Sequence, residues 1–117
     1  MESCAGRRTG QCILRVSGPL SSETEASFLE QVRVETAPVV ILDLSGVHYA
    51  DSRGIAALIQ LYKTFKREHR RLGLVALDER VQRVLEITRV KHFFAVFATL
   101  DEAQEAFIAI AGNGSTL

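Results

Sequence analysis

The chain alternates between short apolar runs and segments with helical spacing. Residues 12–17 carry apolar and β-branched side chains and stop at Gly18-Pro19, which predicts a strand. Residues 39–44 are apolar at successive positions, as in a central strand that is covered on both faces. The same criteria predict further strands at 72–77 and 93–97, and a short hairpin strand at 2–6 before a turn at 7–10. We therefore expect a sheet of four to five strands.

Between these strands, apolar residues recur three and four positions apart. Ser22 and Glu25 form a capping-box pattern, which predicts a helix of about 22–34. Pro38 separates this helix from the strand that follows. The clearest apolar stripe predicts a second helix of about 52–68, with Ile55, Leu58, Ile59, Tyr62 and Phe65 on its inner face.

Two more helices are expected in the second half of the chain. Asp78 stands at a capping position before a stripe that includes Val81 and Leu85, and Thr99 with Glu102 opens a last helix. Residues 112–117 are predicted to be a polar, flexible tail. The order of elements predicts one α/β domain over residues 1–117, with a core of about 12–110 and a mostly parallel or mixed sheet flanked by about four helices.

Composition and charge exclude several classes of protein. The 117 residues include 14 basic and 14 acidic side chains, so the basic excess typical of proteins that bind a phosphate backbone is missing. Two cysteines without CxxC spacing and three scattered histidines predict neither a disulfide framework nor a metal site. No leader pattern is present, and the apolar runs are too short to cross a bilayer. We expect a cytoplasmic protein without a cofactor, direct DNA binding or membrane insertion.

The most informative segment is the loop and helix start at residues 45–54, because functional loops of open α/β sheets gather at the carboxyl ends of strands. Asp51 and Ser52 stand where helix caps are found, and Gly54 falls in the first helical turn. Glycine costs about 1 kcal/mol there relative to alanine. Two interpretations stay open: Gly54 relieves crowding beside an ordinary cap, or it allows the close approach of another backbone.

Enzyme motifs are not found. Ser52 lies outside any GxSxG elbow, and the glycine-rich patterns of nucleotide-binding loops are missing. His48 stands four residues before Ser52, which does not establish hydrogen-bond reach, so we interpret it as a solvated or hydrogen-bonded loop histidine. Acidic pairs such as Asp78-Glu79 begin helices, where the helix dipole explains them. The sequence predicts a protein that is not an enzyme.

A basic cluster lies at the C-terminal end of the long helix and just after it, and contains Lys63, Lys66, Arg67, His69, Arg70 and Arg71. Cations near a helix C-terminus are stabilised by the dipole, so a solvated helix end explains the cluster. The alternative is a surface for an acidic partner or for anionic lipid headgroups.

Residues 39–47 and 49–55, with Asp51-Ser52-Arg53-Gly54 at the helix start, resemble the signature of STAS domains of the anti-sigma-factor antagonist type. The likeness covers roughly residues 12–110. It implies a small α/β domain that binds an anti-sigma factor with GHKL-type serine kinase activity. It also implies that this partner phosphorylates Ser52, that phosphorylation releases the antagonist, and that a phosphatase restores it.

The resemblance predicts a phosphorylation-switched binding module whose partner contacts include Asp51, Ser52, Arg53, Gly54 and Ser21. The chain departs from the family pattern at Arg53, where a small residue is usual, and at 18–21, where the usual acids are missing. The alternative is an unphosphorylated STAS subunit of a larger assembly, such as a stressosome-like scaffold or a lipid-transport ABC complex. The oligomeric state is left open.

Arg53 is itself unusual, because a cation in the first turn of a helix opposes the dipole at a cost of about 0.3–1 kcal/mol. The guanidinium therefore either points into solvent or has a partner. The partners considered are Asp51, a phosphate on Ser52, and an acidic group on the docking protein. The last of these would make Arg53 an interface residue.

Overall fold

A mixed sheet of five strands forms the centre of the molecule. The computed structural model describes the backbone of residues 2–5 and 10–115 and the side chains of residues 10–107. The strand order is β1-β2-β3-β4-β5; β1 is antiparallel to β2, and the other neighbours are parallel. These strands are β1 (Glu2–Ala5), β2 (Gln11–Ser17), β3 (Val39–Gly46), β4 (Arg71–Val75) and β5 (Ala95–Phe97). The predicted fold class is confirmed, including the hairpin strand and the central place of residues 39–44.

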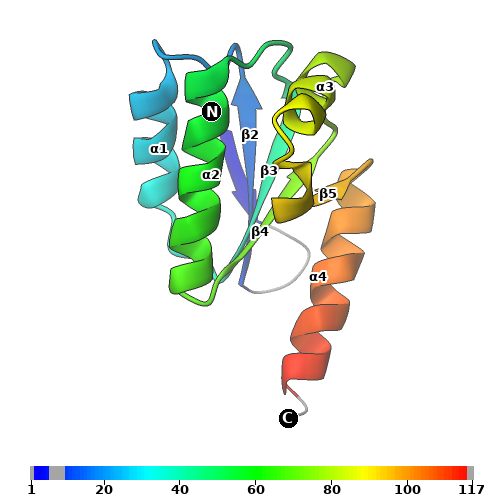
Figure 1. Cartoon of the computed structure of the whole chain (residues 1–117). Helices are drawn as coiled ribbons and strands as arrows, with labels where there is room; N and C mark the ends of the chain where they lie inside the picture. The colour runs from blue at the N-terminus through cyan, green and yellow to red at the C-terminus, as the bar shows by residue number, and fades with distance from the viewer. Residues whose placement is uncertain (1, 6–9, 116–117) are drawn as a thin grey trace.

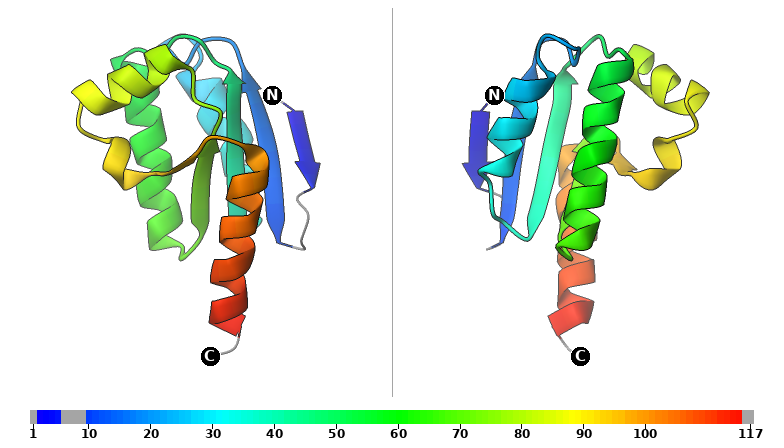
Figure 2. Two further views of the ribbon diagram at one scale, coloured as in Figure 1. Left: turned by 90° about the vertical axis from the view of Figure 1, so that its right-hand side faces the viewer. Right: turned by 60° about the vertical axis from the view of Figure 1, so that its left-hand side comes forward.

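Helices cover the two faces of this sheet unequally. The first three helices, α1 (Glu25–Arg33), α2 (Ser52–Arg67) and α3 (Glu79–Ile87), pack on one face, and α4 (Leu100–Ser115) packs alone on the other (Figures 1 and 2). A short 3-10 helix, η1 (Lys91–Phe93), joins α3 to β5. The described part of the chain thus has a three-layer arrangement of helices, sheet and one helix.

Alternate side chains of β3 enter two separate cores, which explains why its residues are apolar in succession. Val40, Leu42 and Leu44 belong to the core under α1, α2 and α3. Ile41 lies in the smaller core with Phe107 of α4. All four of these β3 side chains have no exposed surface, so each contributes burial energy of about 1.5–3 kcal/mol relative to an exposed position.

The first helix begins later than the sequence predicted. Residues 22–24 form a turn and α1 starts at Glu25, so the capping box expected from Ser22 does not form. The hydroxyl of Thr24 explains the difference: it donates to the Pro19 carbonyl at 2.8 Å and accepts from the Ser21 amide at 3.0 Å. These local bonds hold the segment in a turn that competes with helical geometry.

Other helix and strand boundaries differ from the predicted ones by a few residues. β4 ends at Val75 rather than 77, because Ala76 has a φ of 57°, which extended strands do not adopt. Phe93, expected in a strand, lies in η1, whose turn is closed by the Phe94 amide on the Lys91 carbonyl. The polar tail predicted from 112 is helical through Ser115, since glycine weakens a helix without excluding it. Residues 6–9 and 116–117 lie outside the described residues.

None of the described helices combines the length and apolar character required to cross a membrane.

Candidate functional site at the start of the long helix

The loops after β2 and β3 cross at the N-terminus of α2, and hydrogen bonds of Asp51 connect them. Its Oδ1 accepts from the Gly54 amide at 3.0 Å, which makes Asp51, rather than the other candidate Ser52, the N-cap of α2. Its Oδ2 accepts from the Ser22 amide at 3.4 Å, and its own amide donates to the Leu20 carbonyl at 3.0 Å. The loop after β2 is therefore fixed directly on the loop after β3.

Gly54 is required because the backbone of Leu20 crosses the first turn of α2. A Cβ at residue 54 would lie 2.1 Å from the Leu20 carbonyl oxygen and 2.6 Å from its carbon. Both atoms belong to the backbone and cannot rotate away as a side chain would. The close approach of another backbone, one of the two interpretations of this glycine, is the one that the structure supports.

Ser52 is the first residue of α2, and its side chain is exposed. A helix N-terminus carries a partial positive charge from its unpaired amides, so it stabilises an anion nearby. The Ser52 hydroxyl is therefore accessible, and it lies where a negative charge does not oppose the helix dipole.

Arg53 has a partner that was not among those considered from the sequence. Its Nη1 lies 3.2 Å from Oε1 of Glu25, the first residue of α1. Both ends of this ion pair begin a helix, so the Glu25 carboxylate is favourable to both dipoles and offsets the unfavourable position of the arginine. The Arg53 side chain is nevertheless 67% exposed, which leaves most of it accessible to another molecule.

Ser21 lies in the loop that crosses the start of α2, between Leu20 and Ser22. Its carbonyl accepts from the amides of Thr24 and Glu25, so its backbone forms the turn before α1. The structure thus brings Ser21 into the same loop crossing as Asp51, Ser52, Arg53 and Gly54. We refer to these five residues together as the α2-start surface, in which Gly54 is buried and only positions the others.

Two neighbouring residues on the loop after β3 were not singled out as partner contacts. Tyr49 is 56% exposed although it is aromatic, and exposed aromatic side chains are enriched at protein interfaces. His48 Nδ1 lies 2.8 Å from Asp78 Oδ2, and this hydrogen bond lowers the pKa of Asp78. An aromatic residue in a polar loop was the available signal for Tyr49. The contact of His48 had none, because its partner is 30 residues away.

The site contains no visible catalytic arrangement. His48 pairs with Asp78, the N-cap of α3, and not with Ser52. Asp78 Oδ1 in turn accepts from the Arg80 amide at 2.9 Å, so this acid has a capping role. No group of three or more potential metal ligands was found among the residues that the structure describes.

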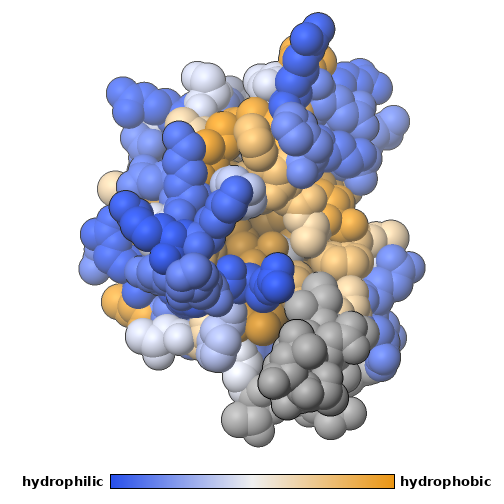
Figure 3. Space-filling view, turned by 60° about the horizontal axis from the view of Figure 1, so that its bottom comes forward, coloured by the Kyte–Doolittle hydropathy of each residue, from blue (hydrophilic) through white to orange (hydrophobic). Residues whose placement is uncertain are grey.

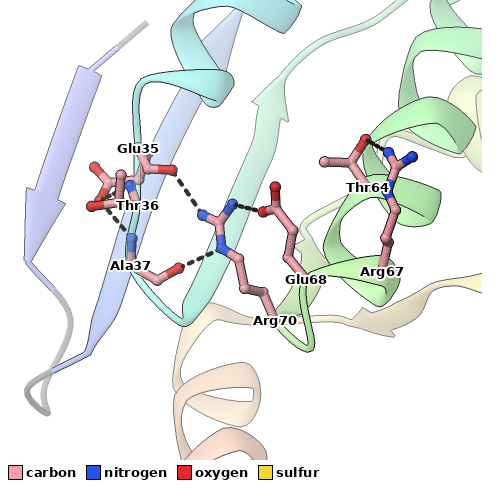
Figure 4. A network of polar contacts seen from close by, with 7 residues as sticks. All are labelled: Glu35, Thr36, Ala37, Thr64, Arg67, Glu68 and Arg70. Carbon is pink, nitrogen blue, oxygen red and sulfur yellow. Dashed lines mark hydrogen bonds and ion pairs between the residues drawn. The ribbon is translucent and has the colours of Figure 1, made fainter.

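The basic cluster contains one structural residue. The Arg70 guanidinium donates to the carbonyls of Glu35 and Ala37 at 2.8 and 3.0 Å and to the Glu68 carboxylate at 2.9 Å (Figure 4). It also lies over the Phe65 ring, 4.0 Å from the centroid. Arg70 therefore holds the connection between α1 and β3 against the end of α2, whereas most of the other cations in the cluster are solvated.

The fold and this loop crossing define a small α/β domain that presents an exposed serine at a helix start. The chain belongs to the STAS domain family, whose model matches residues 5–103. Among curated proteins it is similar to an anti-sigma-B factor antagonist of Listeria monocytogenes, with 29% identity over 85 residues, 70% of this chain and 75% of the relative.

Solved structures show the same fold. A crystal structure named for an anti-sigma factor antagonist from Thermotoga maritima has a TM-score of 0.82 and 24% identity, covering 90% of this chain and 92% of that one. A sulfate transporter family protein from Wolinella succinogenes has a TM-score of 0.80 and 21% identity, with 90% of each chain covered. The same architecture thus occurs in proteins whose names indicate different functions.

Proposed function

We propose that this protein is an anti-sigma-factor-antagonist-like binding module whose α2-start surface docks on a partner anti-sigma factor. In this proposal a GHKL-type serine kinase activity of the partner phosphorylates Ser52, phosphorylation releases the module, and a phosphatase restores it. The protein acts in the cytoplasm and is not an enzyme. The exposed position of Ser52 at a helix start, directly after the Asp51 cap, is the observation that supports this most strongly.

The switch follows from charge rather than from a change of fold. A phosphoserine adds about −1.5 to −2 charges, which the start of α2 accommodates. The Asp51 carboxylate is already held by the amides of Gly54 and Ser22, so the loop crossing remains bonded. A partner that buries Ser52 must instead desolvate the new charge, and a loss of about 2.7 kcal/mol would weaken binding a hundredfold.

Phosphorylation also changes which anion the Arg53 guanidinium can pair with. A phosphate on Ser52 competes with Glu25 for the guanidinium, because phosphate is the more highly charged acceptor and arginine binds it in a bidentate manner. The surface that the partner meets would then differ in two ways: a new anion on Ser52 and a redirected cation on Arg53.

Phosphosite mapping after incubation with the cognate kinase tests the proposal. We expect label on Ser52 and no label on Ser52→Ala, whereas Ser45→Ala, which removes another exposed serine at the same end of the sheet, keeps full labelling. The phosphorylated protein should melt within a few degrees of the unmodified one. Label on another serine, or on none, contradicts the switch.

Binding measurements on Arg53 and Glu25 variants separate a partner contact from an internal role. If Arg53 meets an acidic group of the partner, Arg53→Ser weakens binding by about 1 kcal/mol or more and reduces its salt dependence. Glu25→Gln, which frees the same guanidinium, then leaves binding unchanged or stronger. Equal weakening by both variants would show that the pair only holds α1 beside α2.

The second candidate function is a STAS subunit of a larger assembly in which Ser52 is not modified. The structural likeness to a sulfate transporter family protein favours it, since the same domain there bears a transport name. A pull-down with the wild type and Ser52→Asp distinguishes the two: equal retention of a permease or an ATPase by both proteins supports the assembly.

A further inference from the structure

The first residues of β4 have no partner on the side of β5, because β5 is the shorter strand. β5 pairs with β4 only from Gly73 onward, where Gly73 faces Ala95, so Arg71 and Leu72 have no β5 partner. A hollow of about 280 Å³ opens at this edge between the end of α2, η1 and α4. The α2 residues that line it, Tyr62, Phe65 and Lys66, follow Ser52 by 10 to 14 positions, so they lie about 15–21 Å from Ser52 along the helix axis at about 1.5 Å per residue.

The floor of the hollow is apolar and largely aromatic. Tyr62 and Phe65 come from α2, Phe93 from η1, and Phe107 from α4. Figure 3 shows this end of the molecule as an apolar depression with hydrophilic residues along one side. The Phe93 ring packs on Tyr62 with centroids 5.4 Å apart and is still 41% exposed. Covering this aromatic surface would release about 25 cal/mol for each Å² removed from water.

The hydrophilic side of the hollow carries cations that are available to a ligand. Arg70 is occupied by the network already described, but Lys66 and Arg71 form no ion pair with the residues whose side chains are described. Together with His69 and Arg70 they line a second hollow of about 240 Å³. The two hollows share Lys66, Arg70 and Arg71, so an apolar space and a cationic space adjoin.

We infer that this composite hollow, named here the β4-edge pocket, binds a small amphipathic anion. Its carboxylate or phosphate head meets Lys66 and Arg71, and its apolar body lies against Tyr62 and Phe93. The apolar space holds about nine groups of water size at about 30 Å³ each, which suits a chain of about eight carbons. This volume lies near the lower end of the range of small-molecule sites.

Backbone NMR titrations of the full chain test the inference with four probes: octanoate, octyl phosphate, 1-octanol and acetate. Octanoate and octyl phosphate should shift the amides of the β4-edge pocket and saturate with a Kd below about 1 mM. Octanol, which lacks the charge, and acetate, which lacks the chain, should bind at least about tenfold more weakly. Equal binding of octanol and octanoate would refute a role for the cations. Octanoate that shifts no pocket amide would refute the site.

Matched variants locate the site. Arg71→Glu and Lys66→Glu should each weaken octanoate binding about tenfold or more, whereas Lys63→Glu makes the same charge change on α2 outside the pocket and should change it less than about twofold. Ala95→Leu fills the hollow from an exposed position of β5 and keeps every cation, so it should abolish saturation.

Two outcomes contradict the inference directly. Equal weakening by Lys63→Glu and Lys66→Glu would indicate nonspecific attraction to the basic helix end. Stronger sedimentation with phosphatidylglycerol vesicles than with phosphatidylcholine vesicles, unchanged in Ala95→Leu, would indicate a membrane surface rather than a pocket. The Ser52→Asp variant should bind octanoate as the wild type does, because the inference does not depend on the phosphorylation switch.

Discussion

Replacement of Gly54 by alanine tests whether the crossing of the two loops limits the stability of this domain. Helix propensity alone predicts that Gly54→Ala stabilises α2 by about 1 kcal/mol. The structure predicts the opposite sign, because the new Cβ would lie 2.1 Å from the Leu20 carbonyl oxygen. Real Cβ atoms do not approach this closely, so the loop after β2 or the start of α2 must move.

The magnitude follows from what that movement breaks. Forcing an extra methyl into a packed site costs about 1–3 kcal/mol. The Leu20 carbonyl also accepts the Asp51 amide at 3.0 Å, and losing that bond costs about 1 kcal/mol. After subtraction of the propensity gain of about 1 kcal/mol, we expect a net destabilisation of about 1–3 kcal/mol.

Equilibrium unfolding in urea measures the effect. We expect Gly54→Ala to lower the midpoint while the m-value stays that of the wild type. Ala56→Gly is the control, since it makes the reverse exchange at an exposed position of the same helix and should cost about 1 kcal/mol through propensity alone. An unfolding free energy of Gly54→Ala equal to or above the wild-type value would refute the steric argument.

Two further predictions concern charged residues away from the α2-start surface. Arg70→Met should destabilise the domain by about 2–3 kcal/mol in urea unfolding, because two backbone carbonyls lose a charged donor. Arg67→Met should cost less than about 0.5 kcal/mol, because among the side chains that the structure describes its guanidinium meets the Thr64 hydroxyl alone. Burial raises the pKa of Asp43, but hydrogen bonds from Ser45 and the Arg15 guanidinium outweigh it, so this pKa lies below its usual value. The carboxylate therefore stabilises the fold above the unfolded pKa of about 3.9, and this stabilisation is lost as the pH falls through the folded pKa. When the pH is lowered from about 6 to about 3, the unfolding free energy of Asp43→Asn should fall by less than that of the wild type.

Local patterns were sufficient for the parts of this protein that depend on neighbours in sequence. Successive apolar residues at 39–44 indicated a strand covered on both faces, and β3 is central with a core on each side. Asp51 and Ser52 were the two candidates for the cap of the long helix, and Asp51 is the cap. A glycine in the first turn of a helix is unfavourable, and Gly54 therefore suggested that another backbone approaches closely. The backbone of Leu20 does so. In each case the signal comes from a backbone requirement that few residue types satisfy.

Tertiary packing determined which side chains form contacts between segments that are distant in the sequence. Arg53 meets Glu25, 28 residues earlier, and Arg70 meets the carbonyl of Glu35, 35 residues earlier. Neither acceptor is marked in the sequence, because any carboxylate or carbonyl serves once the fold brings it within reach. The β4-edge pocket likewise depends on where β5 begins relative to β4. The sequence by itself determined the order and type of the main helices and strands and which serine begins α2, but not all of their ends. The packing of α1 beside α2 and the length of β5 determined which charges are paired and where the surface is hollow.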